Sequence, residues 1–141
     1  MKNTMLEMSR YAALARQAVA EGVVLLKNEA VLPLAPGGRA ALFGYAQFHY
    51  YKSGTGSGGL VNVTHVPNLP EILGGDGGYR LDAEVQARYA AWLADHPYEM
   101  GTGWAQEPWF QPEMPLDEEF VRAAARRADT AFIVIGRTAG E

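Results

Sequence analysis

Two uninterrupted apolar runs constrain the fold of this chain more than any other feature. Residues 40–43 (AALF) and 131–135 (AFIVI) lack the alternation of a strand with one wet face, and a glycine follows each run directly. Strands buried on both faces are typical of parallel sheets that helices cover on either side. Amphipathic stretches lie between the runs, so the sequence predicts an α/β fold, a three-layer αβα sandwich around a mainly parallel sheet.

The N-terminal half is expected to contribute one long helix and two shorter elements. Apolar residues from Tyr11 onward recur at spacings of three and four, which predicts a helix that ends near Asn28. Strand-like alternation predicts an extended segment over residues 60–66, and residues 67–73 are expected to form a short helix. The glycine-rich residues 74–78 predict a loop.

The C-terminal half is expected to contribute two further helices. Asp82 predicts the start of the first, which ends before Pro97 because the residue preceding a proline avoids helical dihedral angles. Residues 117–119 (DEE) open the second, which has acidic residues at its positive end and arginines near its negative end. The side chains expected to face inward are Val85, Tyr89, Trp92 and Leu93 in the first helix and Val121, Ala124, Ala125 and Ala128 in the second.

The two apolar runs define the expected core. The predicted buried strand residues are Leu42, Phe43, Ile133, Val134 and Ile135, and the side chains predicted to pack on them are Leu14, Leu25, Trp92 and Val121. Residues 1–141 are expected to form one domain. Because the chain stops six residues after a buried strand, we expect that domain to be incomplete. An incomplete sheet exposes an edge at residues 131–135, and since such edges recruit other chains we also expect self-association.

Composition and charge exclude several classes of protein. The chain has 12 Lys and Arg against 16 Asp and Glu, a net charge of −4 without a basic run, which argues against nucleic acid as a partner. It has no cysteine, and its three histidines lack metal-ligand spacing, so neither a metal nor a cofactor is expected. No apolar run approaches the ~20 residues of a membrane span, and the N-terminus does not resemble a secretory signal. We therefore expect a cytoplasmic protein that does not bind membranes.

The glycine-rich loop at residues 54–59 contains the pattern G-x-G-x-x-G, but its context disfavours a nucleotide site. A dinucleotide-binding loop turns directly from a strand into a helix, whereas about ten residues separate this loop from the preceding strand, and a strand-like segment follows it. Lys52 precedes the glycines, so the order of a phosphate-binding P-loop is absent. Ser57 does not stand in the G-x-S-x-G pattern of a hydrolase nucleophile.

The irregular connection between His96 and Pro115 is a second candidate for ligand contact. It combines aromatic rings with amides and carboxylates, namely Tyr98, Trp104, Trp109 and Phe110 with Gln106, Glu107, Gln111 and Glu113. Sugar sites use this mixture, since flat apolar faces stack on the ring and polar groups bind its hydroxyls. The alternative is that the rings close over the core, and composition alone favours that alternative. Glu141, on a glycine-flanked loop beyond a strand, is a candidate catalytic acid.

Three segments carry a family signature when they are taken in order. Residues 15–29 (ARQAVAEGVVLLKNE) are followed by the motif LPL at residues 32–34, residues 52–58 read KSGTGSG, and residues 135–141 read IGRTAGE. These segments resemble the opening helix, the glycine-rich loop and the start of the acid/base motif in the α/β-sandwich domain of glycoside hydrolase family 3. That family includes many β-glucosidases and β-xylosidases. The resemblance spans nearly the whole chain.

The resemblance implies a division of catalytic roles. In that family the aspartate nucleophile usually lies in a (β/α)-barrel domain and the acid/base glutamate in the sandwich domain, and Glu141 aligns with that glutamate. The candidate substrate-binding residues are Lys52, Thr55, Ser57, Trp104, Trp109 and Arg137. Because this chain contains no barrel, the resemblance implies the variant architecture in which the sandwich comes first. The barrel then follows, and the active site forms between the two domains.

Two classes of function remain open on the sequence. In the first, the chain is the sandwich-domain part of a retaining, exo-acting β-glycosidase of β-glucosidase or β-xylosidase type, and is inactive by itself. Its substrate would be a β-linked oligosaccharide or an aryl or alkyl β-glycoside. In the second, the chain is a non-catalytic carbohydrate-binding or interaction module with the same fold. An in-frame barrel with an aspartate nucleophile downstream would decide for the enzyme.

Overall fold

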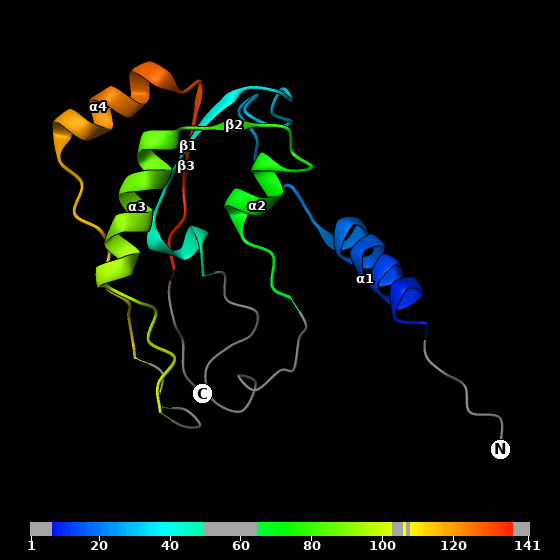
Figure 1. Ribbon diagram of the computed structural model, residues 1–141. Coiled ribbons are helices and arrows are strands. Elements are labelled where there is room, and N and C mark those ends of the chain that lie inside the picture. The colour runs from blue at the N-terminus through cyan, green and yellow to red at the C-terminus, as the bar shows by residue number, and fades with distance from the viewer. Residues whose placement is uncertain (1–6, 50–64, 103–105, 107, 137–141) are drawn as a thin grey trace. The chain divides into compact units, whose positions relative to one another are not determined.

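The computed structural model describes residues 7–49, 65–102, 106 and 108–136 (Figure 1). The chain divides into two compact units, Met1–Leu34 and Ala35–Glu141. Helix α1 belongs to the first unit, and the sheet with its covering helices belongs to the second. None of the helices in the described part of the chain is both long enough and apolar enough to cross a membrane.

Helix α1 is shorter than the sequence predicts. It spans Met8–Gly22, and the backbone is extended at Val23, so the helix ends before the expected stop at Asn28. Glycine and β-branched valine both have low helix propensity, and together they favour this earlier end. Asn28 organises a turn instead, because its side-chain oxygen accepts hydrogen bonds from two backbone N–H groups, each at 3.1 Å.

The apolar stripe of the first unit is exposed. No residue of α1 is buried, and Leu14 and Leu25 are 60% and 58% exposed. Leu25 lies beyond the end of the helix, so it does not share a helical face with Leu14. The packing of these two leucines on the strands of the second unit would join the two units, and it stays a prediction.

A parallel sheet organises the second unit. Its strands are β1 (Arg39–Phe43), β2 (Arg80–Leu81) and β3 (Thr130–Ile133), in the order β2-β1-β3. Residues 40–43 of the central strand β1 are all buried, as expected for a strand covered on both faces. The predicted α/β fold with a parallel sheet is confirmed, whereas β2, only two residues long, was not predicted.

Helices α3 (Ala83–Asp95) and α4 (Glu118–Arg127) cover one face of this sheet (Figure 1). The buried cluster on this face joins β1, both helices and the segment before α4, and its members are Ala41, Phe43, Val85, Tyr89, Met114 and Ala124. Phe120 packs against the cluster, with its ring edge-on to that of Phe43 at a centroid distance of 6.4 Å. The main core therefore lies between β1 and these two helices.

Helix α2 (Leu69–Gly74) covers the opposite face. Leu81 of β2 pairs with Ala40, whose side chain points away from the main core because neighbouring residues of a strand face opposite sides. Leu81 lies against α2, since a Cβ added to Gly74 would come within 3.4 Å of the leucine side chain. Helix, sheet and helix thus form the three layers that the sequence predicts.

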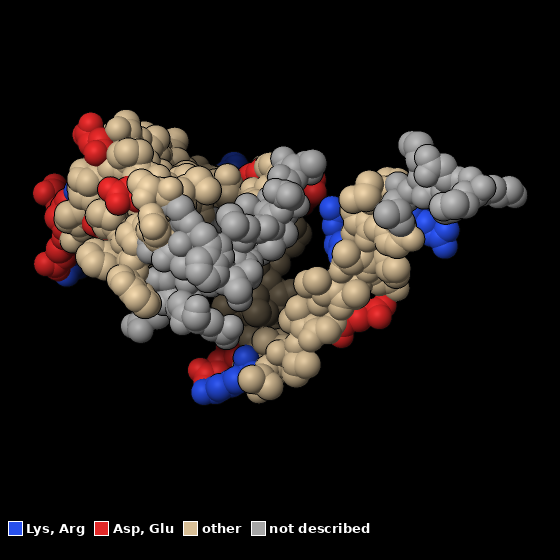
Figure 2. Space-filling view, turned by 90° about the horizontal axis from the view of Figure 1, so that it is seen from below, with Lys and Arg blue, Asp and Glu red and all other residues tan. Residues whose placement is uncertain are grey.

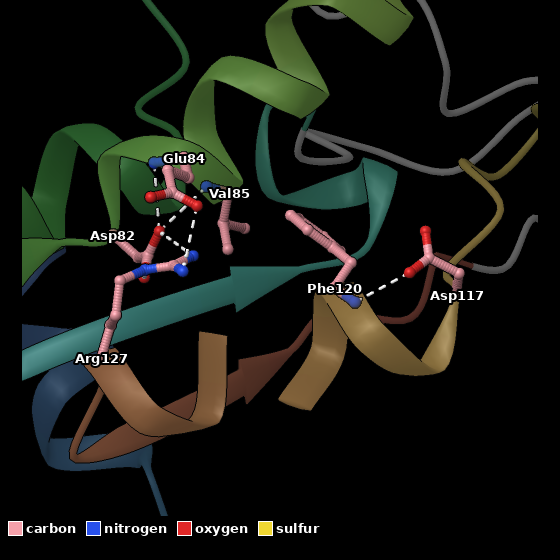
Figure 3. Close-up of polar contacts among 6 residues, drawn as sticks. All are labelled: Asp82, Glu84, Val85, Asp117, Phe120 and Arg127. Atoms are coloured by element: carbon pink, nitrogen blue, oxygen red, sulfur yellow. Dashed lines mark hydrogen bonds and ion pairs between the residues drawn. The ribbon is translucent and has the colours of Figure 1, made fainter. Parts of the chain in front are cut away.

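Capping side chains mark the helix starts. Asp82 accepts hydrogen bonds from two backbone N–H groups in the first turn of α3, at 3.0 and 3.1 Å, and Asp117 accepts one in α4 at 2.8 Å (Figure 3). Both predicted helix starts are confirmed, and the short helix expected over residues 67–73 is α2. Of the extended segment predicted over residues 60–66, only 65 and 66 are described, and they form no strand.

The inward stripe of α4 differs by one position from the prediction. Ala124 is buried and Ala128 packs against the core, both as expected. Val121, 38% exposed, and Ala125 are exposed, and Phe120 packs inward instead. Residues 120, 124 and 128 follow one another at i, i+4 spacing and lie on one helical face. In α3 the prediction holds better, because Val85 and Tyr89 are buried and Trp92 packs against the main core.

Strand β3 differs most from the prediction. Ile133 and Ile135 are 73% and 78% exposed, Val134 is half-buried, and the strand ends at Ile133, so the predicted burial of all three is wrong. The reason is that β3 is an edge strand, which pairs only with β1 in the described part of the sheet. Self-association through this edge stays a prediction, which light scattering over a range of concentrations tests.

Candidate functional site

A cavity of about 330 Å³ opens beyond the carboxyl ends of β1 and β3. Ligands of parallel α/β sheets bind at this edge. The cavity lies between the two strand ends, α3 and the segment before α4, and its lining includes Gly44, Tyr45, Tyr89, Phe110, Glu113 and Val134. The sequence expectation of a site at the carboxyl edge therefore corresponds to a real hollow in the structure.

The two strand ends meet at Gly44 without room for a side chain. Gly44 has a φ of 99°, a region that favours glycine. A Cβ at this position would lie 2.0 Å from the carbonyl oxygen of Val134. The Val134 N–H also donates to the Phe43 carbonyl at 2.8 Å. Glycine is therefore required for β1 and β3 to approach each other at the rim of the cavity.

Glu113 fastens the segment before α4 to the end of β1. Its Oε2 accepts a hydrogen bond from the Tyr45 N–H at 2.7 Å. Its Oε1 accepts one from the Met114 N–H at 2.9 Å and a longer one from the Tyr89 hydroxyl at 3.4 Å. Both oxygens of this carboxylate are thus engaged within the protein.

Tyr89 extends the same network into the core. Its side chain is fully buried, and its hydroxyl oxygen accepts a hydrogen bond from the Gly44 N–H at 2.7 Å. Burial raises the pKa of this phenol to about 12, and the nearby Glu113 carboxylate also raises it. The hydroxyl therefore keeps its proton at neutral pH and can donate to Glu113 while it accepts from Gly44.

Sequence reasoning missed this network. Tyr89 was identified only as part of the apolar stripe of α3, and Glu113 only as a polar neighbour of aromatic rings. A buried tyrosine usually finds a hydrogen-bond partner for its hydroxyl, so a tyrosine in an otherwise apolar stripe was the available signal. The identity of its partner depends on tertiary contact across 24 residues of sequence.

A group of stacked rings borders the cavity lining at Tyr45. The ring of Tyr45 stacks with those of His49 and Tyr98 at centroid distances of 5.4 and 5.9 Å, and the last two stack with each other at 4.8 Å. Burial lowers the pKa of His49, which favours the neutral imidazole. No group of three metal-ligating side chains occurs within the described ranges.

The described polar side chains of the connection between His96 and Pro115 mostly organise their own backbone. The Gln111 amide donates to the Glu99 carbonyl at 2.8 Å and accepts from the Glu99 N–H at 3.2 Å. The Thr102 hydroxyl donates to the Gln106 side chain at 2.6 Å. These contacts engage the polar groups within the segment, but the rings of Trp109 and Phe110 are exposed and do not close over the core.

Among the predicted site residues, Trp109 is described. It is 78% exposed, and its neighbour Phe110, 76% exposed, lines the cavity. The other predicted residues, Glu141, Lys52, Thr55, Ser57, Trp104 and Arg137, lie outside the described residues, as does Glu107. Gly136, directly before Arg137 in the sequence, also lines the cavity. The segment that carries the candidate acid Glu141 therefore starts at this rim.

The described surface of the second unit that is visible from below carries few charged side chains (Figure 2). Acidic side chains gather toward its left edge.

Comparison with known proteins identifies close relatives of this sequence, although no family model matches it. The chain is 48% identical over 136 residues to the β-glucosidase of Ruminococcus albus, a match that covers 96% of this chain and 14% of that protein. It is 39% identical to β-glucosidase A of Butyrivibrio fibrisolvens, over 94% of this chain and 15% of that protein. The chain thus spans about a seventh of the length of these relatives.

Solved β-glucosidase structures contain the same fold. A β-glucosidase from Paenibacillus barengoltzii is 44% identical over 96% of this chain and 15% of its own, with a TM-score of 0.84. β-Glucosidase 3B from Thermotoga neapolitana, in complex with glucose, is 33% identical over 96% of this chain and 19% of its own, with a TM-score of 0.80. The chain is therefore homologous in sequence and in fold to one segment of β-glucosidases.

Proposed function

We propose that this chain is the acid/base-bearing segment of a retaining β-glucosidase of glycoside hydrolase family 3. The observation that carries the proposal is the 48% identity to a β-glucosidase across 96% of the chain. The geometry supports it, because the segment that leads to Glu141 leaves β3 at the rim of the cavity beyond the strand ends. The substrate is a β-linked glucoside, either an oligosaccharide or an aryl or alkyl glycoside.

In this mechanism Glu141 transfers protons, and a carboxylate from another part of the full-length protein forms the covalent bond. Glu141 donates its proton to the glycosidic oxygen while the nucleophile attacks the anomeric carbon and the alcohol leaves. It then takes a proton from water, whose oxygen displaces the enzyme carboxylate and releases the sugar. A retaining enzyme holds the two carboxyl groups roughly 5–5.5 Å apart.

The remaining predicted site residues would contact the substrate around this acid. Lys52, Thr55 and Ser57 belong to the glycine-rich loop, Arg137 precedes Glu141 by four positions, and Trp104 and Trp109 supply flat apolar faces. We propose that the nucleophile lies in a barrel domain that follows this segment in the full-length protein, and that the active site forms where the two domains meet.

The test is Glu141→Ala in the full-length protein. Proton transfer by a general acid or base raises the reaction rate by about 10²–10⁴-fold, and the gain is largest for leaving groups that depart poorly as anions. We expect hydrolysis of alkyl glucosides to fall by that factor, while the glycosylation step with dinitrophenyl glucosides is spared. Added azide should restore turnover, because this small nucleophile releases the trapped glycosyl-enzyme without base catalysis.

Two controls make this experiment decisive. Glu119→Ala removes a carboxylate on α4 that forms no ion pair within the described residues, and we expect unchanged rates. The 141-residue chain by itself should hydrolyse no glucoside, since it lacks the nucleophile. Equal rate losses for good and poor leaving groups, without azide rescue, would remove Glu141 from this role. Hydrolysis by the isolated chain would contradict the proposed division of roles.

A further inference from the structure

A close backbone contact between the ends of β1 and β3 forms the rim of the cavity. Gly44 directly follows β1 and lies against Val134, so that a Cβ at position 44 would come to 2.0 Å from the Val134 carbonyl oxygen. The Val134 N–H in turn donates a hydrogen bond to the Phe43 carbonyl at 2.8 Å. Any shift of Gly44 is therefore transmitted to Val134 and to the chain that leaves β3 toward Gly136.

Two side chains hold Gly44 and its neighbour through their backbone N–H groups. The Gly44 N–H donates to the Tyr89 hydroxyl at 2.7 Å, and the Tyr45 N–H donates to Glu113 at 2.7 Å. The Tyr89 hydroxyl also donates to Glu113 at 3.4 Å, which closes the network. The end of β1 is thus held both by Val134 and by this pair of side chains.

The polar atoms of this pair are used inside the protein. Glu113 accepts from Tyr45, Met114 and Tyr89, and the Tyr89 hydroxyl both accepts and donates. A sugar hydroxyl that displaced one of these partners would leave another polar group of the protein unsatisfied. Their contribution to the cavity is therefore to its geometry.

We propose that Tyr89 and Glu113 are positioning residues, which fix the ends of β1 and β3 and so hold residues 134–136, from which the chain continues to the acid/base glutamate, at the cavity rim. This inference rests on the proposed function. The inference extends the proposed function because it assigns a role to two residues that would not touch the substrate. It also explains why a buried phenol and a carboxylate face two backbone N–H groups at this end of the sheet.

Misplacement of an acid has a distinctive kinetic signature. A displacement of about 1 Å in a reacting group can cost roughly 10²-fold in rate. The cost falls on proton transfer, so it is large for alkyl leaving groups and small for dinitrophenolate, which departs without protonation. A mutation that merely lowers the folded fraction reduces both rates by the same factor.

The experiment measures kcat/KM, which reports the glycosylation step, for Tyr89→Phe and Glu113→Gln in the full-length protein, with an alkyl and a dinitrophenyl β-glucoside. We expect kcat/KM for the alkyl glucoside to fall by about tenfold, with less than roughly threefold loss for the dinitrophenyl glucoside. KM for the alkyl glucoside, whose glycosylation limits turnover, should stay within about twofold of the wild type, since neither residue is proposed to bind the sugar.

Matched variants control for the change in chemistry. Tyr79→Phe removes a hydroxyl from the other face of the sheet, where the Tyr79 ring meets Phe132 edge-on. Glu119→Gln removes a surface carboxylate from the first turn of α4. Both controls should keep wild-type rates on both substrates. Tyr89 is buried, so Tyr89→Phe can fail to fold. In that case Glu113→Gln, which changes an exposed residue at the rim, is sufficient for the test.

The outcomes separate this inference from the proposed function. Equal losses on both substrates, or rates like those of the controls, would overturn the positioning role of Tyr89 and Glu113 even if Glu141→Ala shows leaving-group dependence. If the wild type hydrolyses no β-glucoside, or if Glu141→Ala shows no leaving-group dependence, the proposed function itself fails. If Tyr89→Phe, Glu113→Gln and Glu141→Ala all lose more activity on the alkyl than on the dinitrophenyl glucoside, the result supports both the positioning role and the proposed function.

Discussion

The two ends of the parallel sheet have hollows of similar size and opposite chemistry. At the carboxyl end the cavity measures about 330 Å³, and at the amino end a hollow of about 300 Å³ lies among Arg39, Arg80, Asp82 and Arg127. The carboxyl end is held by backbone amides, a neutral phenol and one carboxylate. The amino end is held by ion pairs. The volume of the hollow therefore does not distinguish the two ends, but the kind of bond that holds each end does.

The ion pairs of the amino end join α4 to the start of α3, and β1 to the segment before β3. Arg127 at the end of α4 binds Asp82, the cap of α3, at 2.7 Å, and Arg39 of β1 binds Asp129 before β3 at 2.6 Å (Figure 3 shows the first pair). The Arg39 guanidinium and backbone N–H lower the pKa of Asp129 to about 2. Burial raises the pKa of Asp82, but hydrogen bonds from Arg127 and from the first turn of α3 outweigh it and lower the pKa overall.

The largest effect should come from Gly44→Ala at the carboxyl end. The new Cβ would lie 2.0 Å from the Val134 carbonyl, and the backbone would keep a φ of 99°. We expect the free energy of unfolding to fall by about 3–5 kcal/mol, since both a backbone clash and an unfavourable φ must be relieved. Urea unfolding measures this loss.

A second glycine separates the clash from the backbone strain. Gly78 also has a positive φ, 65°, but a Cβ there would meet nothing within 4 Å. Gly78→Ala should therefore cost only about 1–2 kcal/mol, the strain of a left-handed alanine. Equal losses in the two variants would show that the close approach of β1 and β3 contributes nothing to stability.

Sequence reasoning predicted the parts of the fold that local signals specify. Asp82 and Asp117 begin helices because their side chains bond to backbone N–H groups a few residues away, a signal visible in the sequence. The burial of β1 follows from its apolar run. The same argument failed for Ile133 and Ile135, because an edge strand and a central strand can have the same sequence pattern while their neighbours differ.

The candidate site was predictable in place but not in detail. Glycines directly after two apolar runs placed it at the carboxyl edge, and Gly44 and Gly136 indeed line the cavity. The bonds from Gly44 to Tyr89 and from Tyr45 to Glu113 span 45 and 68 residues of sequence. No periodicity or motif relates such distant positions, so only the folded chain reveals this network.

At the amino end, the larger effect is expected from Asp82→Ala. The Asp82 side chain is only 4% exposed, and it both caps α3 and binds Arg127. Loss of the cap alone should lower the free energy of unfolding by about 1–2 kcal/mol. The loss of the ion pair adds to this, because among the described residues Arg127 then keeps only the exposed Glu84 as an ion-pair partner. Urea unfolding is again the measurement.

Two substitutions separate the contribution of the α3 cap to stability from that of the ion pair. Asp82→Asn keeps an oxygen that can cap the helix but removes the charge, so it should cost less than Asp82→Ala. Asn68→Ala removes the cap of α2, which bonds to the Glu71 N–H at 2.9 Å without an arginine partner, and should cost about 1 kcal/mol. If Asp82→Ala costs no more than Asn68→Ala, the ion pair contributes nothing.

The smallest effect should be the pH dependence that Asp129 confers. Its pKa is lowered from 3.8 to about 2 in the folded protein, so the folded state binds its proton less readily than the unfolded chain. This group therefore stabilises the protein above about pH 4, and the contribution is lost as the pH falls toward about 2. Asp129→Asn should be less stable than the wild type near pH 6, and the difference should close across that window.

The measurement is the urea midpoint of both proteins at several pH values between about 2 and 6. Asp76→Asn, in the turn after α2, is the control, since Asp76 forms no ion pair in the part of the chain that the structure describes. The pair is exposed, with about half of each side chain accessible, 49% for Arg39 and 53% for Asp129, so salt should weaken the effect. A constant difference between wild type and Asp129→Asn across this pH range would mean that the Arg39–Asp129 pair does not hold the amino end by charge, and the contrast between the two ends would then rest on Asp82 alone.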